Sequence, residues 1–157
     1  AFAAILESGA VVTWGHPNFG GDSGQVQDQL RNVQHVQSTA AAFAAILESG
    51  AVVTWGDPDF GGDSSQVQEQ LKNVQQIQAT GSAFAAILES GAVVTWGYPD
   101  YGGDSSEVLR DVQHVQAAGG GAFAAILESG AVVTWGSPRG GDSSQVRERL
   151  SLNAGLL

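Results

Sequence analysis

Pairs of apolar runs separated by a glycine-containing turn dominate the hydrophobic pattern of this chain. One pair is the stretch 84–89, which is apolar up to its final Glu89, then Ser90 and Gly91, then a second apolar run over residues 92–96. Apolar runs of this length, joined by two turn residues, predict a β-hairpin.

A two-residue turn also fixes which side chains face each other. We expect Leu88 opposite Val93, and Trp96 opposite the small Ala85. Both faces of the hairpin then carry apolar side chains, so the hairpin must be sandwiched between neighbouring elements.

The hairpin sequence is repeated. The same fifteen residues start at Ala1, Ala42, Ala83 and Ala122. The repetition indicates an array of units of about forty residues. Purely structural roles are expected for tryptophans in the core, glycines in the turns and aspartates as caps: Trp14, Trp55, Trp96, Trp135, Gly9, Gly50, Gly91, Gly130, Asp22, Asp63, Asp104 and Asp142.

The segment before each hairpin has a different period. After Asp63, the apolar positions Val67, Leu71 and Val74 fit one face of a helix, so a short helix is expected from Ser65 to about Lys72. Residues 73–79 can either finish that helix or form an irregular strand with a bulge. The turn over residues 79–82 favours the strand, which makes each unit a three-stranded blade.

The third unit indicates which part of the repeat is core and which part is peripheral. Asp104 and Val112 are closer in sequence than Asp63 and Val74, by three residues. A connector tolerates such a loss, whereas a buried strand would lose its register. The sequence therefore predicts a mainly β, propeller-like array of four three-stranded blades with a short peripheral helix per repeat. It forms one repeat domain, residues 1–157, with units of approximately 1–32, 33–73, 74–111 and 112–157.

Composition narrows the possible partners. The formal net charge is -10, which disfavours nucleic acid. No apolar run is long enough to span a bilayer, and the absence of cysteine leaves the compartment open. The absence of methionine, even at position 1, favours a segment of a longer chain or a processed product.

Residues 73–97, from Asn73-Val74 through the hairpin to Trp96-Gly97, resemble the regulator-of-chromosome-condensation repeat. The short period is even more similar to the compact blades of the bacterial β-lactamase-inhibitor propellers, and similar tandem repeats occur in predicted algal proteins. The resemblance implies a propeller blade. Alanine stands at position 83 where that family has histidine, and residues 102–105 replace its Gly-Gln-Leu-Gly. These differences leave the resemblance of the blade intact but argue against the standard closed ring of seven blades. No functional residue of the family carries over to this sequence.

Catalytic and metal-binding signals are weak. Residues 57–63 alternate carboxylates with a glycine bend, as calcium loops do, but the other units break the pattern, which favours turns and caps. Ser23, Ser64 and Ser105 lack a glycine-flanked elbow. We therefore predict no catalytic residue, no cofactor and no metal.

Variation between the units is concentrated in the loop that follows each Trp-Gly strand. On an unvarying scaffold, such a loop is where a binding surface is diversified. The candidate partner-binding rim consists of His16, Asn18, Phe19, Asp57, Asp59, Phe60, Tyr98, Asp100, Tyr101, Ser137 and Arg139.

The preferred function is a non-catalytic scaffold or protein-binding module that presents this rim to a protein partner. The alternatives are a structural subunit of a large complex, for example an algal photosynthetic one, and more remotely an enzyme. End blades expose apolar faces, which further repeats, a second molecule or a larger complex would cover. In a further alternative, a strand from residues 152–157 closes a ring of four blades.

Overall fold

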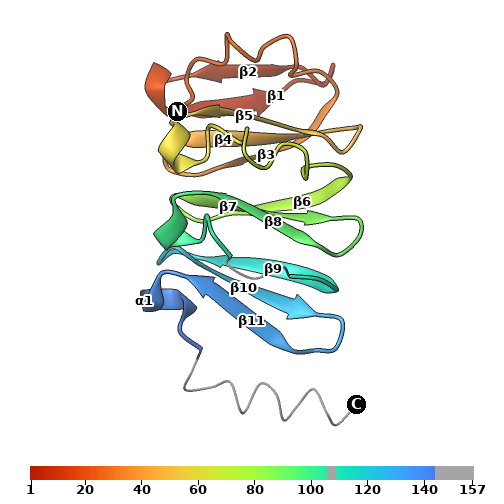
Figure 1. Ribbon diagram of the computed structural model, residues 1–157. Helices are drawn as coiled ribbons and strands as arrows, with labels where there is room; N and C mark the ends of the chain where they lie inside the picture. The colour runs from red at the N-terminus through yellow and green to blue at the C-terminus, as the bar shows by residue number, and fades with distance from the viewer. Residues whose placement is uncertain (106–108, 144–157) are drawn as a thin grey trace.

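The computed structural model describes residues 1–105 and 109–143, which form four antiparallel β-sheets stacked face to face (Figure 1). The sheets are β1–β2, β3–β4–β5, β6–β7–β8 and β9–β10–β11. The strands are β1 (Phe2–Ile5), β2 (Val11–Trp14), β3 (Val33–Ser38), β4 (Ala42–Leu47), β5 (Val52–Gly56), β6 (Val74–Ala79), β7 (Ala83–Leu88), β8 (Val93–Gly97), β9 (Val112–Ala118), β10 (Ala122–Leu127) and β11 (Val132–Gly136). The predicted mainly β, propeller-like array is confirmed.

The array is open. In Figure 1 the sheet β1–β2 lies at one end of the stack and the sheet β9–β10–β11 lies at the other. The first sheet has two strands among the described residues, so β1, the counterpart of the central strands β4, β7 and β10, is paired on one side only. Residues 152–157, which a closed ring of four blades requires as a strand, lie outside the described residues.

The hairpin loops are one residue longer than the sequence pattern suggested. The Leu88 amide donates to Ala92 O at 2.9 Å, and the Gly91 amide donates to Leu88 O at 2.9 Å. Gly91 has a φ of 79°, which completes a three-residue loop made of a turn and one left-handed residue. The predicted two-residue turn is therefore wrong.

This longer loop changes the register by one residue. Trp96 lies opposite Phe84, not opposite Ala85 as predicted, and Val93 lies opposite Ile87. The shift moves Trp96 to the same face as Phe84, where the two rings stack with centroids 5.2 Å apart. A one-residue change is enough because side chains alternate between the two faces of a strand.

The expected helix from Ser65 to Lys72 is a run of turns instead. The Ser64 hydroxyl donates to Gln68 Oε1 at 2.8 Å, and Gln68 Nε2 donates to Val52 O at 3.1 Å. These polar side chains tie the connector to the edge strand β5 and compete with a helical backbone. The apolar spacing of this segment nevertheless places one side chain inside, because Leu71 is buried in the core.

Within residues 1–105 and 109–143, each unit has one short helix, but it follows the hairpin. These are the 3-10 helices η1 (Pro17–Phe19), η2 (Pro58–Phe60) and η3 (Pro99–Tyr101) and the α-helix α1 (Pro138–Gly141). The preferred strand interpretation of residues 73–79 is confirmed by β6, whose register against β7 shifts between Val74 and Gln76 as a bulge does.

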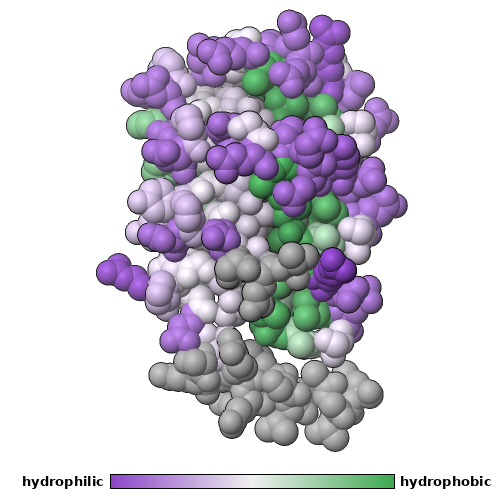
Figure 2. Space-filling model, viewed as in Figure 1, coloured by the Kyte–Doolittle hydropathy of each residue, from purple (hydrophilic) through white to green (hydrophobic). Residues whose placement is uncertain are grey.

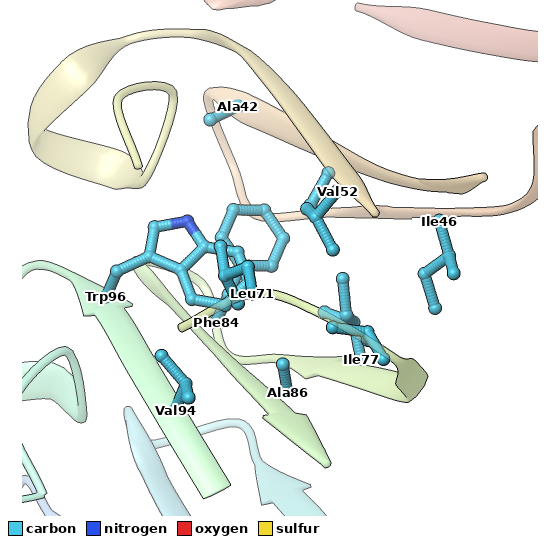
Figure 3. Close-up of a cluster of buried hydrophobic side chains, with 11 residues drawn as sticks. Ala42, Ile46, Val52, Leu71, Ile77, Phe84, Ala86, Val94 and Trp96 are labelled. Atoms are coloured by element: carbon cyan, nitrogen blue, oxygen red, sulfur yellow. The ribbon is translucent and has the colours of Figure 1, made fainter. Parts of the chain in front are cut away.

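The core lies between successive sheets. Figure 3 shows the cluster between the second and third sheets, where apolar side chains of β4 and β5 meet those of β6, β7 and β8. The cluster contains Ala42, Ala44, Ile46, Val52, Leu71, Val74, Ile77, Phe84, Ala86, Val94 and Trp96. Ala83, Ala85, Ile87 and Val93 on the other face belong to the next cluster, so the third sheet is buried on both faces as predicted.

Neighbouring units are joined at the hairpin loops. Gly50 O accepts from the Val74 amide at 2.9 Å, and Asn73 O accepts from the Glu89 amide at 2.8 Å. Gly50 has a φ of 79°, and a Cβ added there would lie 2.9 Å from the Asn73 Cα atom. Only glycine allows both this backbone conformation and this close approach.

The opposite side of the stack has a second joint. Trp96 Nε1 donates to Gly61 O of the preceding unit at 3.1 Å. Trp55 makes the same bond to Gly20 O at 3.0 Å, and Trp135 makes it to Gly102 O at 3.3 Å. Each of these buried tryptophans therefore contributes both apolar area and a satisfied indole N–H to an interface between units.

Candidate functional site

The four short helices lie one below another along a single side of the stack, the left side in Figure 1. Each begins with a proline directly after the residue that follows a Trp-Gly strand. Proline suits this position because its φ is already helical and it has no N–H to leave unpaired. η1, η2 and η3 end at a glycine in the left-handed region, which stops the helix after one turn.

The helices η2 and η3 are fixed to their blades by hydrogen bonds. The Tyr98 amide donates to Ser82 O at 2.9 Å, and Thr80 Oγ1 donates to Tyr101 O at 3.2 Å. In the second unit the Asp57 amide donates to Ala41 O and Thr39 Oγ1 donates to Phe60 O. In these two units, the backbone that carries the variable side chains is therefore held in place by the turn between the first two strands of the same blade.

Two pairs of rings project from this side. The rings of His16 and Phe19 stack with centroids 4.5 Å apart, and those of Tyr98 and Tyr101 are tilted with centroids 5.3 Å apart. Phe19 is 43% exposed, Tyr98 41% and Tyr101 44%. Figure 2 shows residues of intermediate hydropathy along much of this side, with hydrophilic residues among them. Such surfaces are typical of protein contacts, where aromatic side chains are enriched.

The structure does not present every residue of the candidate rim. Those that are exposed are His16, Asn18, Phe19, Asp59, Tyr98, Asp100, Tyr101 and Arg139. Asp57 and Phe60 are half-buried, and Phe60 packs against the core. Ser137 is buried, so its side chain is not available at the surface.

Grooves separate consecutive short helices. A groove of about 680 Å³ between η2 and the third unit is lined by Asp59, Asp63 and Tyr98, among others. A groove of about 860 Å³ between η3 and α1 is lined by Tyr101, Asp104 and other residues. Because the caps are the same in every unit, variation between units gave no signal that Asp63 and Asp104 line grooves beside the rim.

Two of the four aspartates expected to act as caps, Asp22 and Asp63, cap turns. Asp63 Oδ1 accepts from the Ser65 amide at 2.9 Å, and Asp22 Oδ1 accepts from the Gly24 amide at 2.8 Å. Hydrogen bonds from the Ser65 backbone and side chain lower the pKa of Asp63, since they favour its charged form. Asp57 Oδ1 caps η2 through the Asp59 amide at 3.0 Å.

Neither a metal centre nor a nucleophile emerges from the described residues. Within residues 1–105 and 109–143, no three acidic, histidine or cysteine side chains gather as metal ligands would. Ser64 is buried, its hydroxyl donates to Gln68 Oε1, and it lies 2.9 Å from Thr54 Oγ1. Ser23 has the equivalent contacts with Thr13 and Gln27. The hydroxyl groups of Ser23 and Ser64 are therefore engaged in hydrogen bonds with structural side chains.

Comparison with known proteins gives a fold. No protein-family model and no curated protein matches the sequence. The solved structure of human WBSCR16 is similar with a TM-score of 0.59 at 17% identity, over 85% of this chain and 44% of that one. Yeast RCC1 (Prp20), solved with Kap60, is similar with a TM-score of 0.54 at 15% identity, over 85% of this chain and 39% of that one. The chain has the RCC1-like repeat fold.

A second structure of Prp20p, from Saccharomyces cerevisiae, gives a TM-score of 0.51 at 13% identity and covers 85% of this chain and 41% of that one. The chain thus spans less than half the length of these RCC1-like structures. At such identities the RCC1-like blade is what they share. No helix in the part that the structure describes is both long and apolar enough to cross a membrane.

Proposed function

We propose that this RCC1-like array is a non-catalytic protein-binding module, and that its partner docks on the rim of short helices. The observation that carries the proposal is the set of exposed aromatic side chains on one side of the stack, Phe19, Tyr98 and Tyr101, with the backbone of η3 held by the Thr80 hydroxyl. Aromatic side chains on a fixed backbone contribute contact area at low cost in conformational entropy.

The structural relatives support a protein as the partner. Yeast RCC1 is bound to Kap60 in one structure, and the other Prp20p structure is described together with binding to Gsp1p and histones. This chain has a net charge of -10 and acidic grooves beside the rim, so it would attract a partner surface of positive potential.

The test compares two sides of the same molecule. The rim variant replaces Phe19, Tyr98 and Tyr101 with serine, and the control replaces the exposed Glu48, Glu89 and Glu128 of the hairpin loops with serine. Proteins from an extract of the source cells are cross-linked to each tagged variant and quantified by mass spectrometry. The proposal expects partners of the unmodified chain to be depleted about tenfold or more by the rim variant and retained by the control.

Retention of the same partners by the rim variant would contradict a rim contact. Equal loss from both variants would place the contact elsewhere or show that the fold had been damaged, which circular dichroism of the variants distinguishes. A structural subunit of a large complex stays the alternative, because the exposed apolar face at the N-terminal end of the stack also suits embedding.

A further inference from the structure

Two grooves of the rim are equivalent and lie one repeat apart. The groove of about 680 Å³ is lined by Asp59 and Tyr98, and the groove of about 860 Å³ in the next unit is lined by Asp100 and Tyr101. They are named here the Asp59 groove and the Asp100 groove. Asp59 and Asp100 occupy the same position in the helices η2 and η3. The rim thus presents the same chemistry twice, in successive units of the stack.

Each groove has one tyrosine wall, and both tyrosines belong to the same short helix. Tyr98 directly precedes η3 and lines the Asp59 groove, whereas Tyr101 ends η3 and lines the Asp100 groove. The two side chains are 41% and 44% exposed, so ring surface is open to a partner. The Tyr98 amide donates to Ser82 O and Thr80 Oγ1 donates to Tyr101 O. The helix η3 is therefore a fixed ridge with one groove on each side.

Both grooves are acidic. Besides Asp59 and Asp100, the carboxylates that line them belong to Asp63, Asp104 and Asp142. Among the described residues of the two linings there is no lysine, arginine or histidine. A guanidinium group stacks on an aromatic ring and pairs with a carboxylate through two parallel hydrogen bonds. A tyrosine ring beside carboxylates is therefore suited to an arginine side chain.

The repeat sets the distance between the two grooves. Sheets stacked face to face lie about 10 Å apart, and η2, η3 and α1 lie one below another along the stack (Figure 1). In an extended strand, side chains on one side are about 7 Å or about 13 Å apart, and neither value fits. A polyproline II helix has three residues per turn and rises about 3.1 Å per residue. Its residues i and i+3 thus point to the same side at a separation of about 9 Å, which fits.

We infer that the partner docks through a polyproline II segment whose arginines at positions i and i+3 each enter one groove. One guanidinium group lies against Tyr98 and pairs with Asp59, and the other lies against Tyr101 and pairs with Asp100. Aromatic-lined grooves are surfaces on which polyproline II segments dock, because such segments have little conformational entropy to lose. This inference rests on the proposed function and names the chemistry of the partner.

Synthetic peptides test the spacing on the unmodified whole chain. Each is a short proline-rich peptide with a fluorophore and two arginines, which are separated by one, two or three prolines. Fluorescence anisotropy measures the Kd of each. The peptide with two intervening prolines should bind about tenfold or more tightly than the other two, because it alone places both guanidinium groups in grooves at once. Exchanging both of its arginines for lysine should weaken binding, since an ammonium group cannot form the two parallel hydrogen bonds.

Substitutions in the chain test each groove separately. Asp59→Asn and Asp100→Asn should each weaken binding of the peptide with two intervening prolines about fivefold or more, because one charge-assisted hydrogen-bonded pair is lost. Glu89→Gln removes the same charge from an exposed hairpin loop and is the matched control, which should change the Kd by less than about twofold. All three positions are exposed, and circular dichroism checks that the fold is kept.

Three outcomes would overturn the inference. Equal affinity for the three spacings would show that only the total charge matters. An equal loss in Glu89→Gln and Asp59→Asn would place the contact outside the groove. Tighter binding of a helical peptide with arginines seven residues apart would show that the partner segment is an α-helix.

Failure of this inference is distinguishable from failure of the proposed function. If none of the peptides binds at concentrations up to about 1 mM, while proteins of the extract still depend on Phe19, Tyr98 and Tyr101, the arginine segment is wrong and the rim contact holds. If proteins of the extract are retained when these three side chains are replaced, the rim contact itself is wrong.

Discussion

The hairpins β1–β2 and β7–β8 have the same sequence and different surroundings. In both, phenylalanine lies opposite tryptophan with the rings stacked, at 5.4 Å for Phe2 and Trp14 and 5.2 Å for Phe84 and Trp96. The exposure differs greatly: 51% for Trp14 and 4% for Trp96. Hairpin geometry is thus a property of the local sequence, whereas burial is a property of the neighbouring unit.

The difference follows from the order of the stack. Trp96 has a preceding unit, which provides the apolar face under the ring and the Gly61 carbonyl for its indole N–H. The first hairpin has no preceding unit among the described residues. Identical side chains should therefore contribute very different amounts to the free energy of unfolding.

The largest expected effect comes from the tryptophans themselves. Trp96→Ala should reduce the free energy of unfolding by roughly 3–5 kcal/mol, because it leaves a cavity between two sheets. Trp14→Ala should cost about 1 kcal/mol or less, because half of its side chain is already in water. Urea denaturation of both variants measures the difference. Equal losses would contradict the comparison.

The next largest effect concerns Gly61, whose carbonyl accepts the indole N–H of Trp96 from the next unit. Gly61 has a φ of 95°, and a Cβ added there would lie 2.6 Å from Phe84 Cδ2 in the next unit. Gly61→Ala should cost about 1–3 kcal/mol. Gly81→Ala is the matched control, since a Cβ there meets nothing within 4 Å, and its effect should lie within about 0.5 kcal/mol. If Gly61→Ala leaves the free energy of unfolding unchanged, the contact between Gly61 and Phe84 is not as tightly packed as the distance indicates.

A smaller effect is expected from the connector. Ser64→Ala removes the hydroxyl between Thr54 and Gln68 and should cost about 1 kcal/mol. Ser90→Ala, in an exposed hairpin loop, should change the free energy of unfolding by less than about 0.5 kcal/mol. Thermal unfolding measured by circular dichroism compares the two. A stable Ser64→Ala variant would show that the connector does not support the edge strand.

The smallest effect is a dependence on pH. The pKa of Asp63 is lowered below 3.8 in the folded chain by its hydrogen bonds from Ser65. This contribution to stability is present above the unfolded pKa and is lost as pH falls through the folded pKa. Between about pH 5 and about pH 3, Asp63→Asn should therefore lose less stability than the unmodified chain. Urea denaturation at the two pH values measures this loss for both proteins. An equal loss of unfolding free energy in Asp63→Asn and in the unmodified chain would refute the role of this cap.

Much of the fold could be predicted because each unit repeats the same signals. The hairpins, the strand before them and the burial of both faces all follow from apolar patterning. The register could not, because a glycine at the third loop position, Gly91, fits a three-residue loop as well as a two-residue turn. The sequence predicts a helix in the connector because the spacing of Val67 and Leu71 gives no sign that Gln68, held by Ser64, bonds to β5.

The candidate site could be predicted only in part. Variation between units identified a loop that the structure gathers on one side, but it could not separate the exposed Tyr98 from the buried Ser137. The exposed side of β1 and β2, with Phe2 and Trp14, is predicted only in general terms, as the uncovered end of an array. Its residues have the same sequence as buried ones, so no local pattern distinguishes them.

Residue-resolved amide hydrogen exchange, measured by NMR on the monomeric chain, tests most directly whether neighbouring units confer the stability of each hairpin. The amides of β7 should exchange about 100-fold or more slowly than those of β1, because β7 opens only when the units on both sides separate. Equal exchange rates at equivalent positions of the two strands would show that each hairpin is stable by itself, and would contradict the account.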